Sequence, residues 1–131
     1  MDVTVVLDAW AILALLQNES AAARVGEAMA SGSVAASAIN LGEVHYRQIR
    51  VVGASRADAV TADLRRTLTV VDPDWELVLA ASAVKARGGL SFADAFCIAT
   101  AARLGAPAWT GDREIVAAAD RAGVEVVDLR A

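Results

Sequence analysis

Val3-Thr4-Val5-Val6-Leu7-Asp8 is the stretch of sequence that decides the fold class. Residues 3–7 are aliphatic or β-branched and do not alternate with polar residues, which is typical of a strand covered on both faces in a parallel sheet. Similar short runs recur along the chain, and longer helical stretches separate them. Alternating strands and helices predict right-handed crossovers and a parallel sheet with helices on both faces. The expected fold class is therefore α/β.

The sequence also predicts the positions of the individual elements. A strong helix start is expected at Asp72-Pro73-Asp74, with Asp72 as the N-cap and proline at the first helical position. Glycine ends several of the helices. The expected strands are 3–7, 33–36, 69–71, 106–109 (leading into Thr110-Gly111-Asp112) and 124–127. The expected helices are 11–16, 21–30, 40–52, 55–68, 73–87, 91–105 and 113–122.

Length and composition indicate one globular domain over residues 1–131. A chain of 131 residues that is 56% hydrophobic and 21% charged can bury a self-sufficient core. The longest uncharged run, 28–42, contains Ser, Gly and Asn, so no membrane span is expected. The N-terminus lacks a basic patch before an apolar stretch, and the single Cys97 cannot form an internal disulfide. We therefore expect a cytoplasmic protein.

The net charge of −4, from 12 basic and 16 acidic residues, argues against a protein that coats nucleic acid by neutralising phosphates. It does not exclude a nuclease, because an enzyme that holds metal ions with carboxylates carries acidic residues whose charge the bound cations offset.

Four acidic residues are the candidate site. Asp8 follows the first expected strand and Asp112 follows the fourth, so their carboxylates share a crevice if these strands are neighbours. Glu43 and Asp94 lie near the starts of helices. Taken singly, the acids have an ordinary explanation as helix caps or as members of capping boxes, Asn40 with Glu43 and Ser91 with Asp94.

Taken together, the acids are harder to explain as caps. Asp94 lies on the helix stripe of Cys97, Ile98 and Ala101, an apolar setting in which an unpaired charge is costly. Two carboxylates about 5 Å apart repel each other by roughly 3 kcal/mol at an effective dielectric constant near 20. A cluster of four therefore requires cations or protonation. All-oxygen ligation suits Mg²⁺ or Mn²⁺, which favours phosphodiester hydrolysis.

The order and spacing of these motifs resemble the PIN-domain ribonucleases, and most closely the compact VapC-type toxins of bacterial toxin–antitoxin pairs. The acids are separated by 35, 51 and 18 residues, and the resemblance covers essentially the whole chain. The matching motifs are Leu7-Asp8, Asn40-Leu41-Gly42-Glu43-Val44, Ser91-Phe92-Ala93-Asp94-Ala95 and Thr110-Gly111-Asp112-Arg113.

This resemblance implies a three-layer sandwich with about five parallel strands in the order 3-2-1-4-5. It implies an endoribonuclease that depends on Mg²⁺ or Mn²⁺ and leaves a 5′-phosphate and a 3′-hydroxyl. By analogy, Asp8 and Asp94 are the most direct metal ligands, Glu43 and Asp112 position the metals or the attacking water, and Thr110 supports the site. The implied partners are an RNA substrate, a VapB-like antitoxin lying across the active-site groove, and a second copy of the chain in a homodimer.

One position departs from the family pattern. PIN-domain proteins frequently carry Ser, Thr or Asn after the first aspartate, whereas this chain has Ala9-Trp10. Without a small polar side chain beside Asp8, fewer neighbouring groups orient the metal ligands, which weakens metal binding. The Trp10 ring could pack in the ordinary way, stack on a base or lie in a subunit interface.

Basic residues near the acids have two explanations. Arg47 and Arg50 share a helix face with Glu43, and Arg113 follows Asp112. They form ordinary helix ion pairs or hold the RNA backbone near the metals. His45 lies on another side of its helix, where a ligand role is not expected.

The sequence also predicts which apolar residues outside the motifs are buried and which are exposed. Cys97, Trp75 and Trp109 are expected in the core. The apolar content is high enough to leave exposed patches that partners would cover. The candidates for such patches are Leu13, Leu15, Leu16, Val51 and Val52.

Two other functions are compatible with the residues. A phosphohydrolase of the haloacid-dehalogenase kind would need a second aspartate at position 10, where the chain has Trp10, and only Lys85 is available as a lysine for phosphate. A non-catalytic protein-binding domain would use the acids only as helix caps. A metal-dependent shift in thermal stability distinguishes the caps from a metal site.

Overall fold

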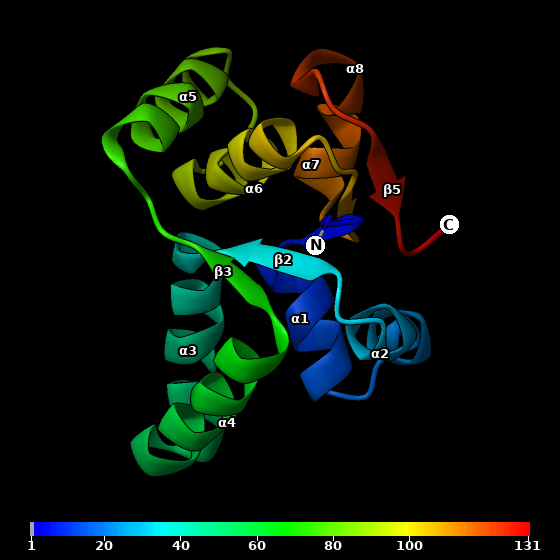
Figure 1. Ribbon diagram of the computed structural model, residues 1–131, viewed down its shortest axis with the longest axis vertical. Coiled ribbons are helices and arrows are strands. Elements are labelled where there is room, and N and C mark those ends of the chain that lie inside the picture. Colours follow the sequence, from blue (N-terminus) through cyan, green and yellow to red (C-terminus); the bar gives the residue numbers. More distant parts are fainter. Residues whose placement is uncertain (1) are drawn as a thin grey trace.

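A computed structural model describes residues 2–131, and its centre is a five-stranded parallel sheet. The strand order is β3-β2-β1-β4-β5, which confirms the predicted order and the α/β fold class (Figure 1). The short strands are β1 (Val5–Leu7), β2 (Val34–Ser37), β3 (Thr69–Val71), β4 (Ala108–Thr110) and β5 (Val126–Asp128). Because β1 lies between β2 and β4, the first segment of the chain is at the centre of the molecule.

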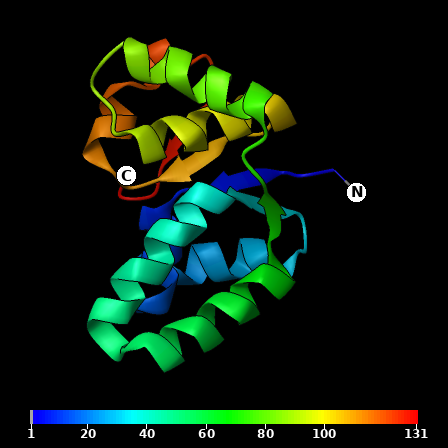
Figure 2. The same cartoon turned by 90° about the vertical axis from the view of Figure 1, so that its left-hand side faces the viewer.

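Helices cover both faces of the sheet. Figures 1 and 2 show the first four helices on one side of the sheet and the last four on the other, with α3 and α4 forming a hairpin that extends away from it. The first group is α1 (Ala9–Leu16), α2 (Ala22–Ala30), α3 (Ala38–Val52) and α4 (Ala54–Thr67). The second group is α5 (Trp75–Ala86), α6 (Phe92–Leu104), α7 (Arg113–Ala117) and α8 (Ala119–Ala122).

The buried β1 strand explains why its sequence does not alternate. Val5 and Leu7 pack in the core formed with α1 to α4, whereas Val6 points into the core formed with α6 to α8. All three residues are buried. Side chains on both faces of this strand therefore leave water, and each fully buried Val or Leu contributes about 1.5–3 kcal/mol to folding.

Two predicted helix starts are wrong because a different polar residue makes the cap. Ser37, at the end of β2, caps α3 by accepting a hydrogen bond from the Ile39 amide at 3.0 Å, so Asn40 lies inside the helix rather than forming a capping box with Glu43. Asp74 caps α5 through the Leu77 amide at 2.8 Å, in place of Asp72. The sequence contains two acceptors near each start, and the one with an extended backbone directly before the first helical residue makes the cap.

Other corrections concern burial and element length. Trp75, expected in the core, is 69% exposed, and Leu13, expected in an exposed patch, is 6% exposed and belongs to the core. The helix expected at 113–122 is divided into α7 and α8 at Ala118. The helix expected at 11–16 begins at Ala9.

The remaining burial predictions are borne out in most cases. Cys97 is fully buried, as expected of a small apolar residue. Trp109 is partly buried against the core, with the Arg24 guanidinium 4.8 Å from its ring centre. Val51 and Val52 are exposed, whereas Leu15 and Leu16 are half-buried. Among residues 2–131, no helix combines the length and apolar character needed to cross a bilayer.

Candidate acidic site

The parallel topology collects acidic side chains from distant segments at the carboxyl end of the central strands. Asp8 caps α1 directly after β1, and Asp112 caps α7 shortly after β4, which is the neighbour of β1. Asp94 lies in the first turn of α6, and Glu43 lies in the second turn of α3. The four acids predicted from the sequence therefore come from four different helices at one end of the sheet.

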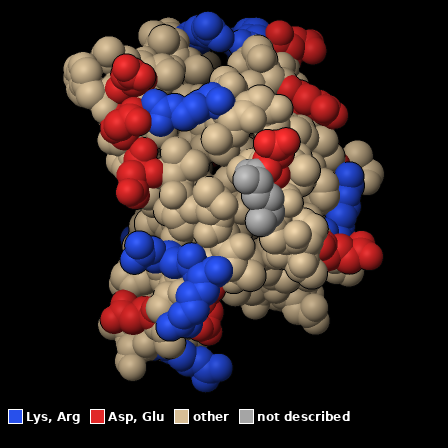
Figure 3. Space-filling model, viewed as in Figure 1, with Lys and Arg blue, Asp and Glu red and all other residues tan. Residues whose placement is uncertain are grey.

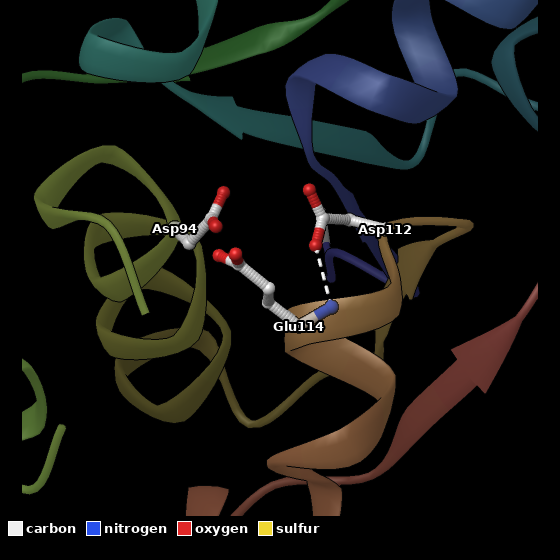
Figure 4. A group of neighbouring side chains, drawn as sticks. All are labelled: Asp94, Asp112 and Glu114. Atoms are coloured by element: carbon white, nitrogen blue, oxygen red, sulfur yellow. Dashed lines mark hydrogen bonds between the residues drawn. The ribbon is translucent and has the colours of Figure 1, made fainter. Parts of the chain in front are cut away.

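Asp94, Asp112 and Glu114 form the tightest group of carboxylates. One oxygen from each lies within 4.8 Å of the others. Figure 4 shows the Asp94 carboxylate on α6 and the Glu114 carboxylate on α7 pointing towards each other, with Asp112 beside them. The amides of Glu114 and Ile115 donate to Asp112 Oδ1, at 2.8 and 3.3 Å, so this carboxylate has a fixed orientation.

Asp8 is buried next to this group and is held on both of its carboxylate oxygens. The Ala11 amide donates to Oδ1 at 2.8 Å, and the Thr110 hydroxyl donates to Oδ2. The same hydroxyl oxygen accepts a hydrogen bond from the Asp112 amide at 2.9 Å. Thr110 therefore connects the two acids that cap α1 and α7, and Asp8 is only 2% exposed.

The environment of the acids raises the pKa of two of them. Burial raises the pKa of Asp8 to about 7, with smaller contributions from the charges of Asp94 and Asp112, although the Thr110 and Ala11 hydrogen bonds oppose the shift. Burial, followed by the charge of Asp112, raises the pKa of Asp94 to about 6. Glu43 and Glu114 add to the repulsion at Asp94. The charged forms of these carboxylates are thus disfavoured without a cation.

Glu43 lies at the side of the site that faces α3. Its side chain is 23% exposed, and its Oε2 lies 3.7 Å from Nη1 of Arg47, one helical turn later. Asn40, one turn earlier, is fully buried and donates from Nδ2 to the Ala93 carbonyl at 2.9 Å. This bond ties α3 to the residue before Asp94. Within residues 2–131, Asn40 Oδ1 has no hydrogen-bond partner.

Glu114 is the acidic residue that the sequence reasoning missed. It lies inside the helix after Asp112 and has the ordinary appearance of an acid in a first turn. No local pattern in the sequence indicates its role, because its place beside Asp94 depends on where α7 begins relative to α6.

Helix capping and metal binding are compatible in this arrangement. Asp8, Ser91 and Asp112 all act as caps, as the ordinary explanation predicted. Capping leaves the Asp94 and Glu114 carboxylates close together and does not remove the repulsion among the acids. A set of carboxylate oxygens with this excess of negative charge fits a divalent cation such as Mg²⁺ or Mn²⁺.

The sequence matches one family of known proteins. A family model described as the PIN domain covers residues 5–121. The chain belongs to the PIN-domain family. The match confirms the predicted family and includes all the acidic residues described above. No curated protein sequence gives a significant match.

Solved structures share the fold of this PIN domain. A DNA-bound VapBC from Salmonella typhimurium has a TM-score of 0.74 and 21% identity, covering 97% of this chain and 98% of that one. VapC20 of Mycobacterium tuberculosis, a sarcin–ricin loop cleaving toxin, has a TM-score of 0.72 and 24% identity, over 88% and 95%. VapBC2 from Rickettsia felis, bound to a promoter fragment, has a TM-score of 0.74 and 13% identity, over 95% and 98%.

The basic residues singled out from the sequence are placed differently around the PIN-domain site. Arg47 pairs with Glu43, whereas the guanidinium of Arg50 lies 5.1 Å from the centre of the Tyr46 ring. Arg113 is exposed next to Asp112. His45 Nε2 lies 2.7 Å from Asp58 Oδ1, which joins α3 to α4 and leaves the histidine away from the acids.

The Thr110 hydroxyl should stabilise the PIN domain measurably. Thr110→Val keeps the shape of the side chain but leaves Asp8 Oδ2 and the Asp112 amide without their partner. We expect the free energy of unfolding to fall by about 1–3 kcal/mol, the cost of buried polar groups left unpaired. Urea denaturation measures this change, and Thr110→Ser, which keeps the hydroxyl, is the control. Equal stability of both variants would show that the hydroxyl link is unimportant.

Proposed function

We propose that this PIN domain is a metal-dependent endoribonuclease and the toxin component of a VapBC-type toxin–antitoxin pair. The observation that carries the proposal is the gathering of Asp8, Asp94, Asp112 and Glu114 at one end of the sheet, with raised pKa values at Asp8 and Asp94. The shared fold with VapC20, a toxin that cleaves the sarcin–ricin loop, supports RNA as the substrate.

The acids would hold Mg²⁺ or Mn²⁺. We assign the ligands to Asp94, Asp112 and Glu114, whose oxygens already lie together, and to Asp8 beside them. Glu43 acts from the α3 side, where Arg47 lies 3.7 Å from its carboxylate. When bound, such a cation lowers the pKa of an attacking water and offsets charge on the phosphate.

The protein's own side chains position the acids and bind the RNA. Thr110 keeps Asp8 and Asp112 in a fixed relation, which removes the cost of arranging them when substrate binds. Arg113, which is exposed and follows Asp112 in the sequence, would hold a phosphate next to the cleaved bond, and Arg47 would contact the RNA from the α3 side. In-line attack of water then leaves a 5′-phosphate and a 3′-hydroxyl.

A basic surface could guide RNA towards this site. Figure 3 shows several basic side chains, with some acidic ones among them, over the part of the surface that α3 and α4 form in Figure 1. The arginines of these two helices are Arg47, Arg50, Arg56, Arg65 and Arg66. Positive charge on one face attracts the RNA backbone even though the whole chain is acidic.

We also propose protein partners and a cellular location for this toxin. Several proteins with this fold were solved as VapBC complexes, which supports a VapB-like antitoxin as the partner. We also propose a homodimer, for which exposed apolar side chains such as Val51, Trp75 and Leu79 provide contact surface. RNA cleavage would take place in the cytoplasm.

Cleavage of RNA by the purified protein tests the proposed function. We expect a random-sequence RNA pool to be cut with Mg²⁺ or Mn²⁺, to remain intact with EDTA, and to yield 5′-phosphate ends. End-group analysis by ligation, with and without prior phosphorylation, identifies the products. Intact RNA under all metal conditions, or cleavage that persists in EDTA, would contradict the proposal.

A further inference from the structure

A pocket of about 210 Å³ lies beside the acidic site, between α1 and α3. Its wall includes the half-buried Trp10 and the exposed Arg47. The residues that line it are Trp10, Leu13, Ala14, Gln17, Glu19 and Arg47. The assignment of the acids to RNA cleavage leaves this pocket without a role.

Trp10 is held against the acidic site by an unusually close contact with Gly111. A Cβ atom at position 111 would lie 2.4 Å from atoms of the indole ring, so only glycine allows the ring to take this position. Gly111 is buried and immediately precedes Asp112, and its φ is not positive, so the requirement for glycine there is steric. The ring therefore packs directly on the loop that carries Asp112.

The opposite wall of the pocket is also connected to the acids. Arg47 lines the pocket and lies 3.7 Å from the Glu43 carboxylate. The pocket thus touches the acidic site through Trp10 on one side and Arg47 on the other. A molecule bound at the acids can therefore extend into this pocket.

The lining fits a flat, polar ring better than an apolar side chain. Four of the six lining residues carry side-chain hydrogen-bond donors or acceptors: the Trp10 indole N–H, Gln17, Glu19 and Arg47. An apolar side chain would remove water from these groups without replacing the hydrogen bonds, which is unfavourable. The volume is below the ~300 Å³ at the lower end of sites for drug-sized ligands, so it suits one small ring system.

We propose that this pocket binds one nucleobase of the RNA substrate, next to the phosphate held at the acids, with Trp10 as the stacking platform and Gln17, Glu19 and Arg47 at the base edge. The proposal rests on the proposed ribonuclease function. An aromatic face stacks on any base, whereas the polar side chains give a preference among bases. PIN-domain proteins frequently carry a small polar residue after the first aspartate. In this chain Trp10 would instead contact the substrate there.

A pair of variants tests the role of the ring in cleavage. Trp10→Leu keeps an apolar side chain but removes the aromatic face, and Trp10→Phe keeps a face. We expect Trp10→Leu to lower kcat/KM for the random RNA pool by about 5- to 150-fold, the range expected for losing one stacked base. Trp10→Phe should recover most of the loss. Sequencing of the products should show a base preference near the cut that weakens in Gln17→Ala.

Binding can be measured separately from cleavage. Asp94→Asn protein is titrated with a random-sequence hexaribonucleotide, and the indole N–H signals of the three tryptophans are followed by NMR. The Trp10 signal, assigned by its loss in Trp10→Phe, should shift most. Trp75, which is 69% exposed and distant in sequence, reports non-specific stacking on any accessible ring.

The outcomes distinguish this proposal from the proposed function. If the wild-type protein cuts no RNA, the ribonuclease assignment fails and this proposal fails with it. If the wild-type protein cuts RNA and Trp10→Leu cuts it equally well, only the base pocket is overturned. If Mn²⁺ no longer raises the melting temperature of Trp10→Leu, the ring has a structural role at the acidic site and the base pocket is overturned. Changed sedimentation with unchanged cleavage would assign the pocket to a protein interface.

Discussion

Replacing Asp94 by Asn should reduce RNA cleavage by about 10²–10³-fold, the scale on which enzymes lose activity when one group that stabilises transition-state charge is removed. Asp94 is the carboxylate that α6 contributes to the group with Asp112 and Glu114. The amide keeps the size of the side chain but removes its negative charge, so a divalent cation would bind more weakly. Steady-state cleavage of a single RNA by both proteins measures the effect.

The control for this change is Asp72→Asn, which makes the same change of charge at an exposed position before α5. It should leave cleavage unchanged. The melting temperature of Asp94→Asn should equal or exceed that of the wild type, because a carboxylate with a raised pKa is removed. Full activity of Asp94→Asn would exclude the acidic group as the catalytic site.

The stability of the metal-free protein should fall as the pH rises from about 4 to about 7. In this range folded Asp8, with its pKa raised to about 7, keeps a proton that the unfolded chain has released at its ordinary pKa of 3.8. The folded state therefore binds more protons, and the unfolding free energy decreases with pH, by up to roughly 4 kcal/mol for Asp8. Asp94, with a pKa of about 6, acts in the same direction.

A divalent cation should offset part of this loss of stability. At 100 times its dissociation constant, Mn²⁺ should raise the unfolding free energy at pH 7 by about 2.7 kcal/mol, whereas acids that are only helix caps would give almost no change. Denaturation in EDTA and in Mn²⁺ across the pH range measures both effects. Hydrogen bonds from Arg103 lower the pKa of Asp74 to about 2, so that group contributes only at more acidic pH.

Asp8→Asn provides the matched variant. Asparagine is also a good N-cap, so the amide can still accept from the Ala11 amide while the buried charge is gone. At pH 7 in EDTA this variant should be more stable than the wild type and show a smaller dependence on pH. A less stable variant, or an unchanged pH dependence, would contradict the assigned environment of Asp8.

The fold could be predicted largely from the sequence because its strongest local signal lies at its centre. The residues of β1 do not alternate, since side chains on both faces are buried, and Asp8 follows the strand at the edge where ligands bind. The strand order came from the family resemblance, because β1 pairs with β4 across a separation of about 100 residues that local patterns do not encode.

Positions decided by tertiary contacts were harder to predict. Asn40 resembles a helix cap in sequence, but its amide group bonds to the Ala93 carbonyl of α6. Trp75 follows a helix start, and only the packing of α5 decides that its ring faces water. Glu114 joins the acids because α7 begins beside α6, an arrangement that spacing alone does not show.

The pairing of β1 with β4 has a consequence for synthesis of the protein. Asp8 lies about 100 residues before Thr110 and Asp112, which complete its surroundings. A ribosome-bound chain in which the segment from β4 to α7 has not yet emerged cannot assemble the acidic site. Under the proposed function, nuclease activity would arise only after this segment has been made, by which time an inhibitor made alongside could already be present.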